Sequence, residues 1–360
     1  MKNKIAIASA FIAASSFSTA EIVVNDFLSF EGFVDMSYQH TDLDSDIIAS
    51  GGAFDGSDNE FEIDQVEISW LFNFDPVTAQ IDLAYEGSDG DQDTVVEQAF
   101  ATYHLEDGSA ITAGRFASML GFEAFEPTGL YQFSFAYDFS ILPGYAEGVK
   151  YTQESDNTFF GISLLDGYTD NDAGYNGRLG GSGDSNYAFE IAGAYTMDNG
   201  ISFFLGGYYE DTEGALADGS TYAINTYVTF ETGAWLFAAE LNFGNSETGA
   251  YDLDVDNDDT AEITSGDDAD AFSALLMANF AYSEKASITG RLSYESIDFD
   301  NADSDEGKQY KLTLAHGYAF TDNLSLITEL SYVDGNLEDD INFDEDYESL
   351  LAGVELLFTF

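Results

Sequence analysis

Apolar and polar residues alternate along much of the chain, and the last twelve residues show this period of two most clearly. In residues 349–360 every even position is apolar, whereas the odd positions include Glu355 and Thr359. Side chains two residues apart lie on one face of a β-strand, so this segment predicts a strand with one apolar and one mixed face. Twelve residues extend about 40 Å, and a tilt of about 45° lets them cross about 28 Å, close to the apolar belt of a membrane-spanning strand.

Sixteen segments of the chain are strand candidates, and ten of them alternate clearly. The candidates are residues 28–38, 61–74, 77–86, 95–105, 110–116, 146–153, 158–168, 187–197, 201–210, 221–230, 234–244, 271–282, 286–297, 309–320, 324–333 and 349–360. The clear ones are the first, the third, the eighth and the tenth to the sixteenth. Those from 110–116 to 158–168 are the least regular, so counts of fourteen and eighteen strands stay open.

Charged residues occupy only one face of the ten clear strands. The apolar face holds no Asp, Glu, Lys or Arg, and the opposite face holds eleven: Glu31, Asp35, Asp82, Glu86, Glu190, Glu240, Arg291, Glu295, Lys311, Glu329 and Glu355. Since 21% of the chain is charged, this separation predicts that one face meets hydrocarbon and the other meets water or buried polar groups.

The connections between the candidates alternate between short and long. The short ones are 75–76, 106–109, 154–157, 198–200, 231–233, 283–285 and 321–323, and the long ones lie near 41–60, 87–94, 117–145, 169–186, 211–220, 245–270, 298–308 and 334–348. A soluble β-sandwich has shorter alternation and a polar outer face, and it does not require this regular alternation. The pattern favours an all-β fold: a transmembrane antiparallel up-and-down β-barrel of about sixteen strands, with both termini in the periplasm.

The composition excludes several other classes of protein. After the N-terminus no apolar run reaches the roughly 20 residues that a membrane helix needs. The absence of Cys excludes disulfides and thiolate metal sites, and three scattered His give no zinc or catalytic-triad pattern. The net charge of −59 makes nucleic acid and anionic lipid poor partners.

The first twenty residues have the pattern of a cleaved secretory signal peptide. Two lysines in Met1–Lys4 precede the apolar run 5–17, and small residues at Ser18 and Ala20 suit cleavage before Glu21. We therefore expect a signal peptide over 1–20 and an outer-membrane β-barrel over 21–360. Export without Cys points to the outer membrane of a Gram-negative cell.

The long loops are acidic, and one of them partly follows the spacing of a calcium loop. Asp252, Asp254, Asp256 and Asp258 occupy alternate positions. However, Asn257 stands where the turn glycine would be and Ile263 where the bidentate Glu would be. We therefore predict no specific metal site there. Loose divalent-cation bridging, within the loops or to lipopolysaccharide phosphate, and a simple solvated surface both stay open.

The third long loop differs from the others because it is strongly aromatic. Seven of the 29 residues in 117–145 are Phe or Tyr, not counting Tyr145, and the loop holds two of the three prolines. Such a loop would not remain in water, and the lumen of a sixteen-stranded barrel is wide enough to receive it. We therefore expect this loop to fold inward.

At this loop the chain resembles a known family, the OmpL-like β-barrel porins of Gram-negative bacteria. The resemblance rests on Gly114-Arg-Phe116, Leu120-Gly-Phe-Glu123, Pro143-Gly144 and Gly148-Val-Lys150. It covers roughly residues 28–153 and, more diffusely, the whole barrel. It implies an outer-membrane channel with an inward-folded third loop.

The resemblance also implies a pore constriction in which loop acids oppose wall bases. The candidate residues are Arg115, Glu123, Glu126, Asp138, Lys150, Arg291 and Lys311. Two other readings remain open: Arg115 pairs with a lumen carboxylate merely to satisfy its charge, and Glu123 is a buried anchor of the loop. The wall is far more acidic than basic, unlike that of an anion channel.

The sequence thus predicts a porin through which small hydrophilic solutes diffuse, with a preference for cations and without cofactor, metal or enzymatic activity. The alternatives are a channel specific for one solute, which the loop aromatics would suit if it is hydrophobic, an outer-membrane hydrolase, and a barrel with a plugged lumen. The expected partners are outer-membrane lipid, lipopolysaccharide and small solutes. A homotrimer is implied by the resemblance alone.

Overall fold

The structure is a computed structural model that describes residues 21–360 except 46–47, 50–51, 54–55, 87–93, 139–141, 168–184, 214–217, 248–250, 254–262, 266–267, 301–305 and 339–343. The predicted signal peptide (1–20) and most of the Asp-rich run 251–259 lie outside the described residues. No helix in the described part of the chain is long and apolar enough to cross a membrane.

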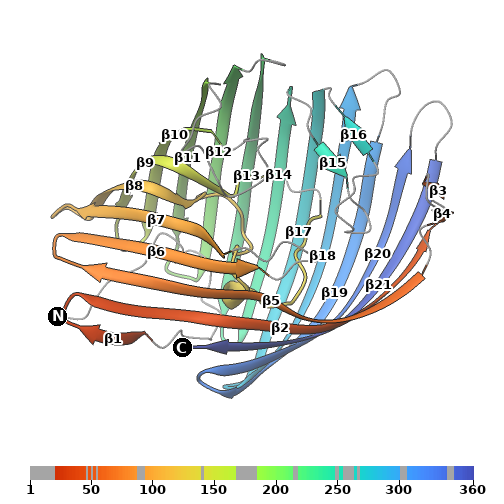
Figure 1. The fold of residues 1–360 in the computed structure, drawn as a ribbon, viewed down its shortest axis with the longest axis horizontal. Coiled ribbons are helices and arrows are strands. Elements are labelled where there is room, and N and C mark those ends of the chain that lie inside the picture. The colour runs from red at the N-terminus through yellow and green to blue at the C-terminus, as the bar shows by residue number, and fades with distance from the viewer. Residues whose placement is uncertain are drawn as a thin grey trace.

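Sixteen antiparallel strands form a closed barrel (Figure 1). They are β2 (Leu28–Ser45), β5 (Gly56–Asn73), β6 (Val77–Glu86), β7 (Thr94–His104), β8 (Ser109–Ala117), β9 (Tyr145–Glu154), β10 (Thr158–Leu165), β11 (Ser185–Thr196), β12 (Ile201–Glu213), β13 (Asp218–Thr232), β14 (Trp235–Ser246), β17 (Asp268–Ser283), β18 (Ala286–Asp300), β19 (Glu306–Thr321), β20 (Leu324–Glu338) and β21 (Asp344–Thr359). The first and last strands close the barrel, with Phe33 opposite Thr359 and Ser45 opposite Tyr347.

The prediction of sixteen antiparallel strands is confirmed, and each predicted segment matches one strand. Several strands are longer than predicted at the end that carries the long loops; β2, for example, continues to Ser45. The extra residues there are largely polar, so hydrophobic alternation does not mark them.

Three small elements are absent from the sequence prediction. β1 (Ile22–Asn25) adds a seventeenth strand beside β2, with Ile22 opposite Phe30. Two short hairpins, β3 (Ile48–Ala49) with β4 (Gly52–Ala53) and β15 (Tyr251–Leu253) with β16 (Ile263–Ser265), lie within long loops. Each is too short to show a period.

The two faces of the wall differ as the alternation predicts. Large apolar side chains point outward, and Leu205 and Leu276 are each 61% exposed. Acidic side chains of the opposite parity, such as Glu190 and Glu240, are at most 2% exposed. A closed barrel leaves no unpaired sheet edge, so its backbone groups are satisfied while the outer apolar side chains face lipid.

Aromatic rings gather at the end of the barrel that carries the short turns. Trp235 stacks on Phe280 with ring centroids 4.4 Å apart, and Phe358 lies 5.9 Å from Phe360. At the same end His316, on the outer face, bonds the Tyr282 hydroxyl at 2.7 Å. Such a ring of amphipathic aromatics is typical of the boundary between membrane and water.

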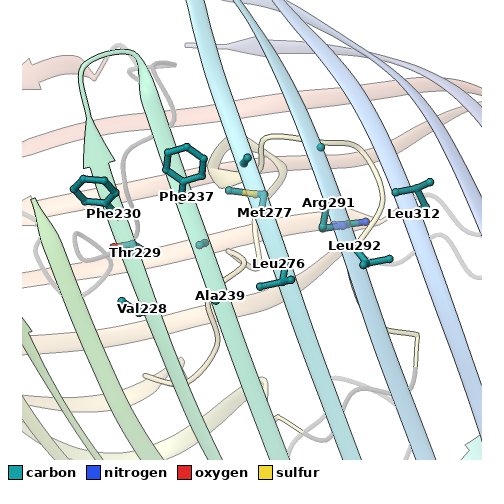
Figure 2. Close-up of a pocket in the computed structure, with 13 residues that line it drawn as sticks. Val228, Thr229, Phe230, Phe237, Ala239, Leu276, Met277, Arg291, Leu292 and Leu312 are labelled. Atoms are coloured by element: carbon teal, nitrogen blue, oxygen red, sulfur yellow. The ribbon is translucent and has the colours of Figure 1, made fainter.

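An apolar hollow of about 520 Å³ lies in the wall over β13, β14, β17 and β18 (Figure 2). Small residues such as Ala239 and Gly290 lie among the outward-facing side chains of Phe237, Leu276 and Leu292. The hollow therefore belongs to the lipid-facing surface and not to a passage through the barrel.

Replacing Leu276 with Arg should destabilise the barrel by about 2–4 kcal/mol, the cost of a charge on the lipid face near the midplane. Leu276→Ala is the control and should cost much less, because lipid chains fill the space that the leucine leaves. Urea unfolding of the protein in lipid vesicles measures both free energies. Equal costs for the two variants would show that Leu276 does not face lipid.

Candidate functional site

Residues 118–138, here called the loop segment, follow β8 and include one short helix, η1 (Pro127–Gly129). Although the segment has little regular structure, five of its residues are almost fully buried. They are Leu120, Phe122, Leu130, Gln132 and Ala136. Leu120, Phe122 and Ala136 belong to one buried cluster with residues of the strands, such as Phe204 and Leu275.

Apolar contacts hold the beginning of the loop segment against β10 to β17. The ring of Phe122 meets Tyr227 edge-on at 5.8 Å, within a cluster that also contains Leu120 and Leu275. Glycines on the wall make room for this packing. A Cβ at Gly161 would lie 2.3 Å from the Met119 sulfur, and one at Gly206 would lie 2.4 Å from Leu120 Cδ2.

Wall carboxylates bind the backbone of the loop segment at the same place. Glu190 on β11 accepts a hydrogen bond from the Met119 N–H at 2.9 Å and another from the Ser118 hydroxyl. Glu240 on β14 accepts the Phe122 N–H at 2.7 Å. The loop lacks a regular ladder, so these acceptors satisfy N–H groups that would otherwise be buried without a partner.

Two further carboxylates bind the end of the loop segment from another part of the wall. Glu329 on β20 accepts the N–H groups of Phe133 at 2.7 Å and Ser134 at 3.1 Å. Glu295 on β18 accepts the Asp138 N–H at 2.8 Å. Four wall acids thus bind backbone N–H groups along most of the segment.

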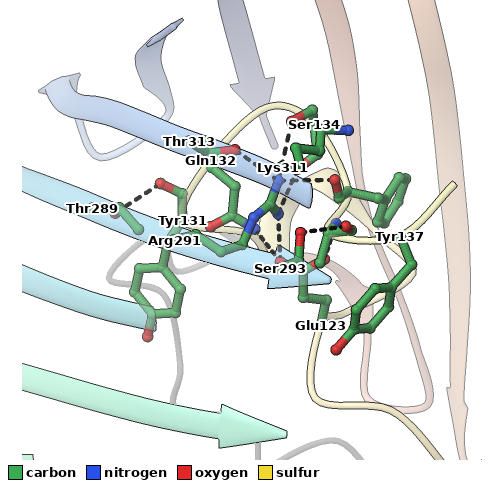
Figure 3. A network of polar contacts seen from close by, with 12 residues as sticks. Glu123, Tyr131, Gln132, Ser134, Tyr137, Thr289, Arg291, Ser293, Lys311 and Thr313 are labelled. Carbon is green, nitrogen blue, oxygen red and sulfur yellow. Dashed lines mark hydrogen bonds and ion pairs between the residues drawn. The ribbon is translucent and has the colours of Figure 1, made fainter. Parts of the chain in front are cut away.

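Arg291 is the centre of a buried polar network (Figure 3). Its guanidinium lies 2.6 Å from Glu123 and donates to the carbonyls of Ser134 at 2.7 Å and Phe135 at 2.8 Å. The ion pair is largely shielded from water, since the side chains of Arg291 and Glu123 are 0% and 10% exposed. Glu123 in turn accepts the Ala136 N–H at 2.8 Å, so it links two parts of the loop.

In two other ion pairs the acidic side chain is exposed to water. Lys311 lies 3.2 Å from Asp138, whose side chain is 45% exposed. Arg115 lies 3.0 Å from Glu147, whose side chain is 46% exposed. These carboxylates are therefore far more exposed than Glu123, whose side chain is 10% exposed.

The remaining two predicted residues have different surroundings. Lys150 is buried, lies 4.2 Å from the centre of the Phe116 ring and donates to the Ala117 carbonyl at 3.5 Å. Glu126 accepts hydrogen bonds from the Tyr145 hydroxyl at 3.1 Å and from Gln65 at 3.3 Å.

The structure therefore pairs two of the predicted loop acids with predicted wall bases, Glu123 with Arg291 and Asp138 with Lys311. That these residues form a pore constriction stays a prediction. Sequence reasoning identified the four wall acids as inward-facing but did not identify their loop partners. It missed Glu67 and Glu97 beside Glu126, because β5 and β7 were not among the clearly alternating strands.

Replacing Arg291 with Met should destabilise the protein by about 3–5 kcal/mol, because Glu123 then remains buried without its charge partner. Adding Glu123→Gln to that variant should recover part of the loss. Lys308→Met, a control at an exposed base 3.8 Å from Glu306, should cost about 0–1 kcal/mol. Urea unfolding in lipid vesicles measures the free energy of unfolding of the two single variants and the double variant. If the losses of the two single variants simply add up in the double variant, the buried ion pair is contradicted.

The comparisons with known proteins agree with this fold. The chain matches the family described as Putative beta-barrel porin-2, OmpL-like, over residues 28–360. No curated protein sequence matches it.

Among solved structures, the outer membrane channel DcaP of Acinetobacter baumannii is similar at 14% identity and a TM-score of 0.65, over 92% of this chain and 97% of that one. The anion-selective porin from Comamonas acidovorans is 12% identical with a TM-score of 0.59, over 92% and 99%. A trimer form of OmpT, an outer membrane protein of Vibrio cholerae, is 12% identical with a TM-score of 0.57, over 93% and 100%. At such identities the likeness shows the fold alone. The chain belongs to the OmpL-like β-barrel porin family and has the outer-membrane barrel fold of porins.

Proposed function

We propose that the protein is a passive channel of the Gram-negative outer membrane, through which small hydrophilic solutes diffuse with a preference for cations. Family membership and the porin barrel support the channel part of the proposal. The preference for cations is argued from this chain's own residues, because an anion-selective porin shares the fold.

The path of the loop segment supports a narrowed channel. The segment leaves the wall at β8 and the chain re-enters the wall at β9, yet its hydrogen bonds reach β14 at Glu240 and β20 at Glu329. A segment with these attachments on inward-facing side chains crosses the interior of the barrel. The passage would then run beside the segment, as in an inward-folded third loop.

The single observation that carries the cation preference is the exposure of Asp138 and Glu147. They are the acidic members of two ion pairs, and each is nearly half exposed. Their partners Lys311 and Arg115 are at most 18% exposed. Where these pairs border the proposed passage, an ion would meet carboxylate oxygen before it meets either base, and fixed negative charge in a low-dielectric passage concentrates cations.

A channel for a hydrophobic solute is the second candidate, and one observation favours it. Phe125 and Phe135 are 38% and 48% exposed although they belong to the otherwise packed loop segment. Exposed rings beside a passage would guide an apolar solute. The hydrolase alternative has no comparable support: His104 bonds the Thr78 hydroxyl at 2.8 Å near a short turn, and His316 lies on the outer face.

The proposal also includes the route and the assembly of the protein. Residues 1–20 would direct export and be removed before Glu21, and the mature barrel would contact outer-membrane lipid and lipopolysaccharide. A homotrimer is proposed by analogy, since a porin-like neighbour has a trimer form.

Neutralising Asp138 and Glu147 together, as D138N/E147Q, should reduce the permeability ratio of potassium over chloride. The matched control is D42N/D44N, which removes two acids from the exposed far end of β2. At 1 M salt, where the Debye length is about 3 Å, only charges beside the passage act, so only the first variant should change selectivity. Reversal potentials in planar bilayers measure this ratio. Chloride preference in the unmodified protein would overturn the proposal.

Flux measurements separate the two channel types. Liposomes containing the protein should take up small sugars and amino acids, and Phe135→Ala should leave that uptake unchanged or raise it. If the protein instead carries a fatty acid faster than sugars, and Phe135→Ala slows that transport, the hydrophobic-solute channel is correct.

A further inference from the structure

Three carboxylates from different parts of the chain meet where the loop segment touches β5 and β7. Glu67 belongs to β5, Glu97 to β7 and Glu126 to the loop segment. One carboxylate oxygen from each lies within 4.8 Å of those of the other two. Like charges at this separation repel strongly, so the group needs a compensating cation or bound protons.

Two of these carboxylates have oxygens with no hydrogen-bond partner. Glu67 and Glu97 are only 6% and 4% exposed. Among the described residues, none donates a hydrogen bond to Glu67 Oε2 or to Glu97 Oε2. A buried carboxylate oxygen without a donor is costly, and such an orphan marks the place of an ion or water.

Neutral donors orient the other oxygens of the cluster. The Ser69 hydroxyl donates to Glu67 Oε1 at 2.9 Å. The Tyr145 hydroxyl and the Gln65 amide donate to the two oxygens of Glu126. These contacts hold the carboxylates in place and leave oxygen lone pairs for a further ligand.

The neighbouring charged groups have partners of their own. Arg115 donates from Nε to the backbone carbonyl of Glu97 at 3.0 Å and pairs with the Glu147 carboxylate. Asp82 on β6 accepts the side-chain amides of Gln80 at 2.9 Å and Gln98 at 2.8 Å. None of these neighbouring groups donates a hydrogen bond to Glu67 Oε2 or Glu97 Oε2.

We propose that Glu67, Glu97 and Glu126 form a Ca²⁺ site that joins the loop segment to the barrel wall. The donors are all oxygens, which suits hard cations rather than zinc or copper. Ca²⁺ binds oxygen at 2.3–2.6 Å, so two of its ligands lie as much as about 5 Å apart, which accommodates the observed group. Mg²⁺ demands near-ideal octahedral geometry and dehydrates reluctantly, whereas Ca²⁺ accepts flexible coordination by side-chain oxygens. Water would complete the coordination.

The site would add an attachment on β5 and β7, which carry none of the four wall acids that bind N–H groups of the loop segment. An ion held by two wall strands and one loop residue would fix the part of the loop around η1. This role does not depend on the proposed function, since it concerns the position of the loop and not the solute.

The direct test is diffraction from crystals of the purified barrel soaked with Tb³⁺, which replaces Ca²⁺ at oxygen sites and scatters anomalously. The proposal predicts an anomalous peak between Glu67, Glu97 and Glu126 that excess Ca²⁺ removes. Peaks confined to the acidic surface loops, with none at the cluster, would overturn it and leave shared protons as the explanation.

A solution experiment tests the same site. Tyr145 touches Glu126 and can sensitise Tb³⁺ luminescence, so part of the signal should disappear in Y145F. Glu97→Gln should weaken the tightest Tb³⁺ binding by roughly tenfold or more, because a ligand is lost, whereas the control D42N/D44N should not. Equal effects of Glu97→Gln and the control on that tightest binding would contradict the site. Circular dichroism and heat-dependent gel mobility confirm that each variant is folded.

Discussion

The position of residues 118–138 against this barrel depends on hydrogen bonds from their N–H groups to carboxylates of the wall. The chain has 68 acidic residues and nine basic ones, so most buried acids cannot find a basic partner. Glu190, Glu240, Glu295 and Glu329 instead accept backbone N–H groups of residues 118–138. Each bond satisfies two groups at once, a buried acceptor on the wall and a donor in a loop without regular structure.

This constraint divides the acids around the loop segment into two kinds. The first kind, which includes Glu123 with its buried Arg291, holds the loop in place and is shielded from solute. The second kind, Asp138 and Glu147, keeps nearly half of its side chain in water. A count of lumen-facing acids therefore overstates the charge that a passing ion would meet. The selectivity proposed for the channel depends on the second kind, and its rigidity depends on the first.

The barrel was largely predictable from the sequence, whereas the interior was not. Alternation determines which side chains face lipid, so the positions of Leu276 and Glu240 follow from local pattern alone. The partners of those side chains do not, because Glu329 and Phe133 are 196 residues apart and meet only after the barrel closes. Glu67 and Glu97 escaped notice for a different reason, because β5 and β7 do not alternate clearly in the sequence. β1 was missed because four residues show no period.

Single-channel conductance of a loop-shortened protein tests the central claim most directly. In this variant a short Gly-Ser linker replaces residues 122–138, which removes the N–H donors to Glu240, Glu295 and Glu329 and leaves the strands intact. If the segment crosses and narrows the interior, the folded variant should conduct several-fold more than the unmodified barrel in the same salt. An unchanged conductance in a variant that still folds would contradict the account.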